Sequence, residues 1–342
     1  MATLIRRSDK GFRRKGILPD AEPVVASVKM DDLEGMVTAW IEDGRSRQHS
    51  PRTLETRRFL SGKLSWWLHK EGRRTCGRDE LKGFFHYLSA AHTSENGRWD
   101  IGDDRSRKPL RPGTVRDYHR HLCTFFTWLV EEAYIEESPM DGIRPPVARA
   151  GQIQPFTEQQ AFALLDAART SRYPHRDEAV ILFLLDTGVR ASELCGILRR
   201  DVDLVNRRAL VMGKGNKQRA VFLSAITAKA VRLYLKDSPG EKNDPLFVTA
   251  RHQAFSRSGL QQVIGRLGRR AGIEAVRCSP HTFRNTAAIF FLRNGGNAFA
   301  LREMLGHTTM AMTNKYVAIA QADVERQHRM YSPVDWLKSG RR

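Results

Sequence analysis

The chain has 342 residues, of which 41% are hydrophobic, enough for ordinary globular cores. At roughly 150 residues per domain, this length predicts about two domains. No apolar run approaches the roughly 20 residues of a membrane span, and the charged N-terminus is not followed by the apolar stretch of a secretory signal. We therefore expect a cytoplasmic protein without membrane contact. The four cysteines form no CxxC pair, so neither a zinc site nor a disulfide framework is expected.

The formal charge of +19 indicates a polyanionic partner, and nucleic acid is the usual one. The charge is distributed unevenly. Residues 1–28 carry 6 basic and 3 acidic groups (+3), residues 29–150 carry 21 and 19 (+2), and residues 151–342 carry 30 and 16 (+14). A merely soluble surface is the alternative. The asymmetry favours a second half built to bind phosphates.

The first half reads as a basic arm followed by a helical bundle. Residues 1–28 lack helical periodicity, and we interpret them as a flexible arm. Four segments with the apolar spacing of amphipathic helices follow: 31–43, one opening at Ser50-Pro51, one including 81–88, and one opening after Pro112-Gly113. Their aromatic residues are interpreted as core, with base stacking as the less favoured alternative. Residues 29–142 therefore predict a small helical bundle without a strand pattern.

Two segments interrupt this periodicity. Residues 92–109 are polar and aperiodic, which predicts a mobile loop. Residues 143–155 include Pro145-Pro146 and no apolar period, and we interpret them as the linker between the domains.

The second half predicts a mainly α domain with a small antiparallel sheet. It opens on a capping box from Thr157 to Gln160. Residues 204–223 alternate short β-like runs around turn signals, which indicates the sheet. Helical patterns are found at 179–185, 225–236, 259–271, 282–294 and 299–305.

Two stretches of this half place a cation at a turn. Arg190 follows Gly188, a residue that can end one helix just before the next begins. A helix N-terminus favours anions, and a guanidinium adds a two-pronged donor for phosphate, although Arg190 could equally be an exposed cap or pair with Glu193. Lys214 lies between Gly213 and Gly215 at the tip of a predicted hairpin. A solvated polar turn would have the same pattern.

Three further stretches carry groups that could act on a phosphate. His281 and Arg284 have the i, i+3 spacing that puts two side chains on one helical face. His307 follows Gly306, a predicted helix terminator, and Tyr316 lies nine residues later. Each alone has a structural explanation, because a histidine can be a cap or a satisfied core residue and a lone tyrosine is usually core.

Taken in order, the stretches TGVRASEL, GKGNKQR, HTFR, LGH and the tyrosine resemble the catalytic signature of the tyrosine recombinases, the phage-integrase and Xer-like family. The motifs cover roughly residues 157–320, and residues 29–145 resemble the family's helical core-binding domain only in size and pattern. The family often has His-x-Leu-Arg-His where this chain has Phe283 and Asn285. We expect Phe283 to be a core residue and Asn285 to lie beside the catalytic pair.

The resemblance implies a DNA strand-transferase with its catalytic domain at 156–320 and a set of catalytic residues: Arg190, Lys214, His281, Arg284, His307 and Tyr316. It implies that Tyr316 attacks a phosphodiester to give a 3′-phosphotyrosine, without metal or ATP. Glu193 would orient Arg190 or another catalytic group, and Lys217 and Arg219 are candidates for holding DNA phosphates. The roles of His281 and His307 are not separated by the sequence.

The resemblance also implies double-stranded DNA with specific recombination sites as partner. A homotetramer on paired sites is expected, with a monomer or weak oligomer off DNA, and residues 321–342 as a C-terminal tail that contacts a neighbouring subunit. Two alternatives stay open: a type IB topoisomerase that relaxes DNA, and a catalytically silent DNA-binding regulator. The target sequence, the accessory proteins and the phage, transposon or chromosomal role are not indicated.

Overall fold

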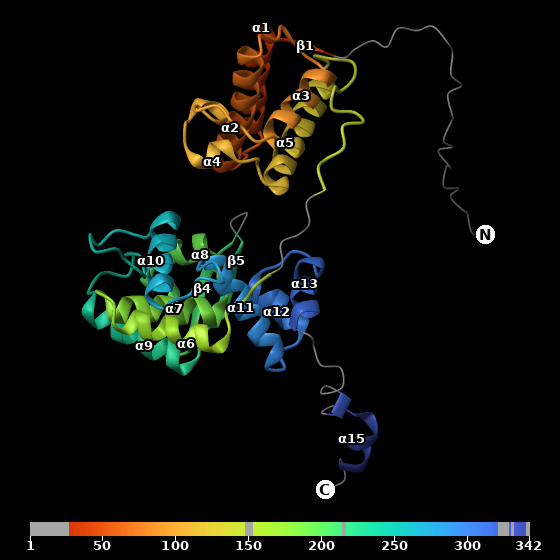
Figure 1. Ribbon diagram of the computed structural model, residues 1–342. Helices are drawn as coiled ribbons and strands as arrows, with labels where there is room; N and C mark the ends of the chain where they lie inside the picture. Colours follow the sequence, from red (N-terminus) through yellow and green to blue (C-terminus); the bar gives the residue numbers. More distant parts are fainter. Residues whose placement is uncertain (1–26, 148–152, 214–216, 321–327, 330–331, 340–342) are drawn as a thin grey trace, which may run out of the picture. The chain divides into compact units, whose positions relative to one another are not determined.

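The computed structural model describes residues 27–147, 153–213, 217–320, 328–329 and 332–339 (Figure 1). The chain divides into two compact units, Met1–Ala150 and Gly151–Arg342, and the division falls within the segment interpreted as a linker. The expected arm, residues 1–28, lies almost wholly outside the described residues, as does most of the tail. None of the described helices combines the length and apolarity that crossing a bilayer requires.

The first unit is a helical bundle, and each of the four expected helices is present in it. Its principal helices are α1 (Met30–Ser46), α2 (Pro51–Lys70), α3 (Arg78–Ser89) and α5 (Pro112–Glu131). The aromatic side chains of Trp40, Phe84, Phe125 and Phe126 are buried among them, as the amphipathic spacing predicts. The mainly helical fold is thus confirmed in this half.

A short strand pair was not predicted. β1 (Val28–Lys29) pairs antiparallel with β2 (Thr75–Cys76) and ties the start of α1 to the end of α2. Because each strand is only two residues long, neither shows the alternation by which a sequence reveals a strand.

The polar segment 92–109 is held by more contacts than its composition indicates. It contains a 3-10 turn, η1 (Arg98–Asp100), and the short helix α4 (Asp104–Arg107). Arg98 is buried and donates hydrogen bonds to two carbonyls of the same segment, while the Trp99 ring packs edge-on against Trp66 at 5.4 Å. Arg98 and Trp99 hold this loop in place. Because two isolated residues form no periodic pattern, the sequence did not indicate that the loop is ordered.

The second unit is built around α7 (Pro174–Thr187), which contacts α6 (Glu158–Arg169), α9 (Ala225–Asp237) and α11 (Pro280–Arg293). Thr157 and Gln160 form the predicted capping box at the start of α6. Because α7 packs on several sides, its residues from Ala179 to Leu185 are all apolar. The remaining elements around it are α8 (Ala191–Gly196), η2 (Arg199–Asp201) and α10 (Arg257–Arg270).

The predicted antiparallel sheet is present in the second unit. It has the strand order β3 (Val202–Asp203), β4 (Arg208–Met212) and β5 (Gln218–Phe222). Met212 pairs with Gln218, and the Gly213 N–H donates to the Lys217 carbonyl at 2.8 Å at the end of this strand pair. The inward residues of β4 are buried and the outward ones exposed, the alternation of a strand with one covered face.

Three consecutive helices close the second unit: α11, α12 (Ala298–Leu305) and α13 (Ala311–Ala320). They enclose a core of their own that includes Ile289, Leu301, Leu305 and Tyr316. The helix α15 (Pro333–Ser339) belongs to the expected tail. The fold is therefore a helical bundle followed by an α-rich domain with a small antiparallel sheet, as the sequence predicts.

Candidate functional site

The first arginine of the site, Arg190, lies where two helices meet. Gly188 ends α7 in the left-handed conformation, with φ 59° and ψ 23°, and Arg190 is the N-cap residue of α8. A Cβ on Gly188 would lie 2.8 Å from Leu305, so the close approach of α12 also requires glycine. The Arg190 side chain keeps 33% of its surface exposed, which leaves part of its guanidinium open to a ligand.

The second arginine, Arg284, lies on α11 and is buried. Its guanidinium donates to the carbonyl oxygens of Gly188 and Leu305, each at 2.7 Å. Burial and then the positive charge of Arg190 lower its pKa to about 10. Arg284 therefore stays charged at neutral pH and adds a fixed positive charge to the site.

The C-terminal end of α12 is the point where the arginines converge. The last carbonyls of a helix lack partners within it and carry the negative end of its dipole. Here each accepts from a different guanidinium: Met304 O from Arg219 at 3.2 Å, Leu305 O from Arg284 at 2.7 Å, and Gly306 O from Arg190 at 3.3 Å. Gly306 ends the helix in the left-handed conformation, φ 63°, as predicted. This end of α12 fixes the arginines relative to His307.

His307 follows this helix end and is buried beside Tyr316. Its Nδ1 lies 2.9 Å from the hydroxyl of Thr313, and its ring stacks on the Tyr316 ring at 6.1 Å between centroids. Burial, followed by the charges of Arg284 and Arg190, lowers its pKa to about 4. His307 is therefore neutral at pH 7. If Thr313 donates to Nδ1, the proton is on Nε2 and can be donated to a ligand.

Tyr316 lies on α13 and is 1% exposed. Its hydroxyl donates a hydrogen bond to Oδ1 of Asn285, at 2.9 Å. Burial raises its pKa, and the charges of Arg284 and Arg190 oppose that rise. The side chain is thus next to the arginine cluster, but its oxygen is covered in this conformation.

Glu193 is the acidic group of the site, and its carboxylate is almost fully buried. It accepts from the Arg190 side chain at 2.8 Å, from the Arg190 backbone N–H at 2.8 Å, and from both terminal nitrogens of Arg219 at 2.6 and 2.8 Å. Burial alone would raise its pKa, but the hydrogen bonds and charges of the arginines outweigh burial and lower it. The expected contact of Glu193 with Arg190 is present, whereas the contact with Arg219 was not predicted.

The other predicted residues are less enclosed. His281 lies in the first turn of α11 and keeps much of its surface exposed. The partial burial of its ring, followed by the charges of Lys315 and Arg284, lowers its pKa. Lys217 is exposed beside β5. Lys214 lies outside the described residues. The structure thus groups Arg190, Arg284, His307 and Tyr316 around one helix end, with Glu193 and Arg219 behind Arg190.

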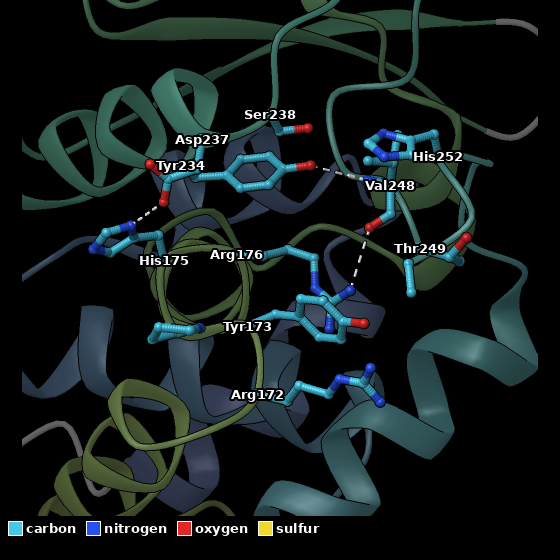
Figure 2. A pocket seen from close by; sticks show the side chains of 12 residues that line it. Arg172, Tyr173, His175, Arg176, Tyr234, Asp237, Ser238, Val248, Thr249 and His252 are labelled. Carbon is cyan, nitrogen blue, oxygen red and sulfur yellow. Dashed lines mark hydrogen bonds and ion pairs between the residues drawn. The ribbon is translucent and has the colours of Figure 1, made fainter.

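A separate cavity lies far from this site. It has a volume of about 360 Å³ and surrounds the N-terminal end of α7, where Arg176 and Tyr173 stack and His175 contacts Asp237 (Figure 2). The 14 residues of α7 separate it from Gly188 by about 20 Å, given 1.5 Å per residue. None of the predicted catalytic residues lines it. The candidate chemistry therefore belongs to the open surface at the other end of α7.

The described part of the chain contains no group of three or more His, Cys, Asp or Glu side chains placed to hold a metal ion. The polar groups gathered at the site are guanidinium, imidazole and phenol groups, together with the Glu193 carboxylate that the arginines already occupy. Such a donor set suits an anion.

Besides the contact of Glu193 with Arg219, two contacts and one helix at this site were not predicted from the sequence. It placed Asn285 beside the catalytic pair but not against Tyr316, and it did not single out Thr313. It also assigned no helix to 311–320. On α13 the i, i+3 spacing of Thr313 and Tyr316 places both on one face, and that spacing was the available signal. The prediction that Phe283 is core is confirmed, because it is fully buried.

The comparisons with known proteins agree with this geometry. The sequence profile described as "Phage integrase family" matches residues 154–323, which include every residue of the candidate site. The chain is 27% identical over 270 residues to tyrosine recombinase XerC of Xanthomonas campestris pv. campestris (strain B100), covering 79% of each chain. It is 29% identical over 283 residues to tyrosine recombinase XerD of Chlorobaculum tepidum, covering 80% of this chain and 87% of the relative.

Solved structures show the same fold. The Tn1549 transposon integrase in complex with a circular intermediate DNA superposes with a TM-score of 0.64 at 20% identity, over 85% of this chain and 99% of that one. A lambda integrase dimer bound to a core site superposes with a TM-score of 0.61 at 15% identity, over 82% and 96%. With the ordered motifs of the second unit and the relatives above, these findings lead to one assignment: the chain belongs to the phage integrase family of tyrosine recombinases.

Proposed function

We propose that this protein is a site-specific DNA recombinase that cleaves and rejoins strands through a 3′-phosphotyrosine on Tyr316. The observation that carries the proposal is the convergence of Arg190, Arg284 and His307 with Tyr316 at the C-terminal end of α12. Two guanidinium groups and a neutral imidazole next to a tyrosine form a site for a phosphodiester and a nucleophile that can attack it.

The arginines would bind the scissile phosphate. In the pentavalent transition state negative charge gathers on the non-bridging oxygens, and planar donors that stay charged stabilise it. Two carbonyl groups hold the Arg284 side chain in place. Its remaining N–H groups can therefore bind a phosphate with little further loss of side-chain freedom. His307, neutral at pH 7, would donate one more hydrogen bond to a phosphate oxygen.

The chemical step exchanges one ester bond for another. The Tyr316 oxygen forms a bond to phosphorus, the bond from phosphorus to the 5′-oxygen breaks, and the hydroxyl proton leaves the tyrosine. Rejoining reverses the step with a 5′-hydroxyl as nucleophile, so no net hydrolysis occurs and no ATP is needed. Because Tyr316 is buried and its hydroxyl is hydrogen-bonded to Asn285, the hydroxyl must leave this contact before it can attack the phosphate.

Two proton carriers complete the proposal. Lys214, on the hairpin between β4 and β5, would protonate the leaving 5′-oxygen. His281, exposed at the start of α11, would accept the proton of Tyr316 or hydrogen-bond the phosphate. Lys217, exposed beside the hairpin, would contact a flanking phosphate.

Double-stranded DNA with specific sites is the proposed partner. The +14 charge of residues 151–342 (30 basic and 16 acidic) would supply most of the affinity through phosphate contacts. We propose a homotetramer on paired sites, a monomer or weak oligomer off DNA, and the bacterial cytoplasm as the location. The named relatives are recombinases and integrases, which favours recombination over the relaxation of DNA by a topoisomerase and over silent DNA binding.

The direct test traps the covalent intermediate. A nicked suicide substrate loses a short fragment after cleavage, so the protein stays attached to DNA and is seen on a denaturing gel. We expect the wild type to form this adduct in EDTA without nucleotide, and Tyr316→Phe to bind DNA normally but form none. An adduct that persists in Tyr316→Phe would mean another nucleophile, such as Tyr331 or Tyr234. Cleavage that needs magnesium would refute the metal-free step.

A further inference from the structure

We infer that Arg219 is a positioning residue that keeps Arg190 available to the phosphate by neutralising Glu193, rather than a residue that itself holds DNA. The inference rests on the proposed function and concerns the same site. The Arg219 guanidinium points toward Glu193 and the end of α12: it donates two hydrogen bonds to the Glu193 carboxylate and one to the Met304 carbonyl.

The charges of the cluster support this role. One carboxylate, Glu193, lies between two guanidinium groups, those of Arg190 and Arg219. Together the three groups carry a net charge of +1, whereas Arg190 and Glu193 alone would carry none. Without Arg219, the buried carboxylate would be compensated only by Arg190, and the attraction of Arg190 for a phosphate would fall.

Burial indicates which arginine faces a ligand. The Arg219 side chain is 14% exposed and that of Arg190 is 33% exposed, while the Glu193 side chain between them is 1% exposed. Arg219 also occupies both carboxylate oxygens, at 2.6 and 2.8 Å, whereas the Arg190 side chain takes only one. The stronger contact is thus with the more buried arginine, and the more exposed arginine keeps donors for DNA.

Arg219 also links β5 to α8, through Glu193, and to the end of α12, through Met304. It is the second residue of β5, directly after Gln218. It reaches the end of α12 through the Met304 carbonyl, and a Cβ on Gly306 would lie 3.1 Å from its Cδ. The Arg219 side chain therefore packs closely against Gly306, the residue that precedes His307.

A double substitution separates the effect of the Glu193 charge from a purely structural role of Arg219. Arg219→Gln leaves the Glu193 carboxylate to Arg190, so the rate of adduct formation on the suicide substrate should fall on the order of a hundredfold. Adding Glu193→Gln removes the carboxylate and releases Arg190, so Glu193→Gln/Arg219→Gln should be at least about tenfold faster than Arg219→Gln. A purely structural role predicts that the double variant is as slow as the single variant or slower.

A substrate without charge at the scissile position provides the second readout. Methylphosphonate replaces one non-bridging oxygen by a methyl group and removes the negative charge. On it, the loss caused by Arg219→Gln should shrink to less than about tenfold, because the charge of Arg190 matters less. Arg219→Lys keeps the charge without the two-pronged contact, so this variant should keep the rate of phosphate cleavage within about tenfold of wild type. It replaces Arg219→Gln as the test variant if Arg219→Gln does not fold.

Arg176→Gln is the matched control. Arg176 is buried and pairs with Asp177 at the far end of α7, outside the site. The Arg176→Gln variant should be less stable than the wild type, but its ratio of phosphate to methylphosphonate cleavage should be unchanged. Wild-type protein that forms no adduct would refute the proposed function itself. With an active wild type, an Arg219→Gln loss that is equal on both substrates, or a double variant that is not faster, would overturn the role of Arg219.

Discussion

The depressed pKa of His307 has a consequence for stability. Its pKa is about 4 in the folded protein, against 6.5 for an ordinary histidine, because the ring is buried among arginines. The unfolded chain therefore binds a proton more readily between these values, and folding stability falls as the pH drops below about 6.5. At about pH 5 the loss from this group is roughly 2 kcal/mol, at 1.36 kcal/mol per unit.

Urea unfolding at neutral and mildly acidic pH measures this effect. His307→Gln cannot take up the proton, so its free energy of unfolding should change less between the two conditions than that of the wild type. His281→Gln is the comparison variant, because the pKa of His281 is also lowered but by less, so its substitution should change the pH dependence less. An unaltered pH dependence in His307→Gln would show that His307 is not the group protonated on unfolding.

Single residues also mark the limit of sequence reasoning. Arg190, Arg284 and Tyr316 could be selected because their motifs follow a family order, and Gly306 because a helix end favours glycine. The partners of Tyr316 and Glu193 could not, because Asn285 and Arg219 are 31 and 26 residues away from them in sequence. Such contacts are set by how α11 packs on α13 and by where β5 passes α8, which no local pattern records.

Among the elements, the hairpin between β4 and β5 gives a direct chemical prediction. If Lys214 on this hairpin is the general acid, Lys214→Ala should slow cleavage strongly on an ordinary phosphodiester. A bridging 5′-phosphorothiolate should rescue it, because sulfur is a good leaving group that needs little protonation. Arg190→Ala and Arg284→Ala should not be rescued, since they would stabilise oxygens that do not leave.

Rates on the two substrates, compared by single-turnover cleavage, test this prediction. Lys217→Ala, from the same hairpin, is the matched control and should respond equally to oxygen and sulfur. If Lys214→Ala stays as slow on the phosphorothiolate as on the phosphate, another group protonates the leaving oxygen.

Elements with strong patterns were predictable and short ones were not. The amphipathic helices α1, α2, α5 and α10 and the β4–β5 hairpin stand where periodicity and turn residues predict them. The strands β1 and β2 have two residues each, too few to alternate. The segment 311–320, which carries Tyr316, was not assigned to a helix, because its apolar residues are spread around the helix without one clear stripe.

For the whole molecule, the central question is how subunits would assemble. The expected tail after residue 320 includes α15, on which Val334 and Leu337 are exposed. We expect that deleting residues 321–342 leaves binding to a single site nearly intact, because the arginines that would bind phosphate lie upstream. It should abolish the complex of paired sites and strand exchange, since exposed apolar residues of a tail are suited to a neighbouring subunit.

Native gels with one site and with two sites, run on full-length and truncated protein, distinguish these effects. Full-length protein in which Val334 and Leu337 are replaced by serine is the matched variant, and it should show the same defect without loss of the chain. Truncated protein that still pairs sites and recombines at the normal rate would exclude the tail as the link between subunits.

Peptide mapping of the trapped adduct identifies the residue that becomes covalently joined to DNA. Trypsin cleaves after Lys315 and Arg326, so Tyr316 is the only tyrosine of its peptide, YVAIAQADVER. We expect mass spectrometry to find the residual nucleotide on this peptide, at Tyr316, with a phosphate joined to a 3′-oxygen. A nucleotide found on the peptide of Tyr234 or Tyr331, or joined through a 5′-phosphate, would exclude a 3′-phosphotyrosine on Tyr316.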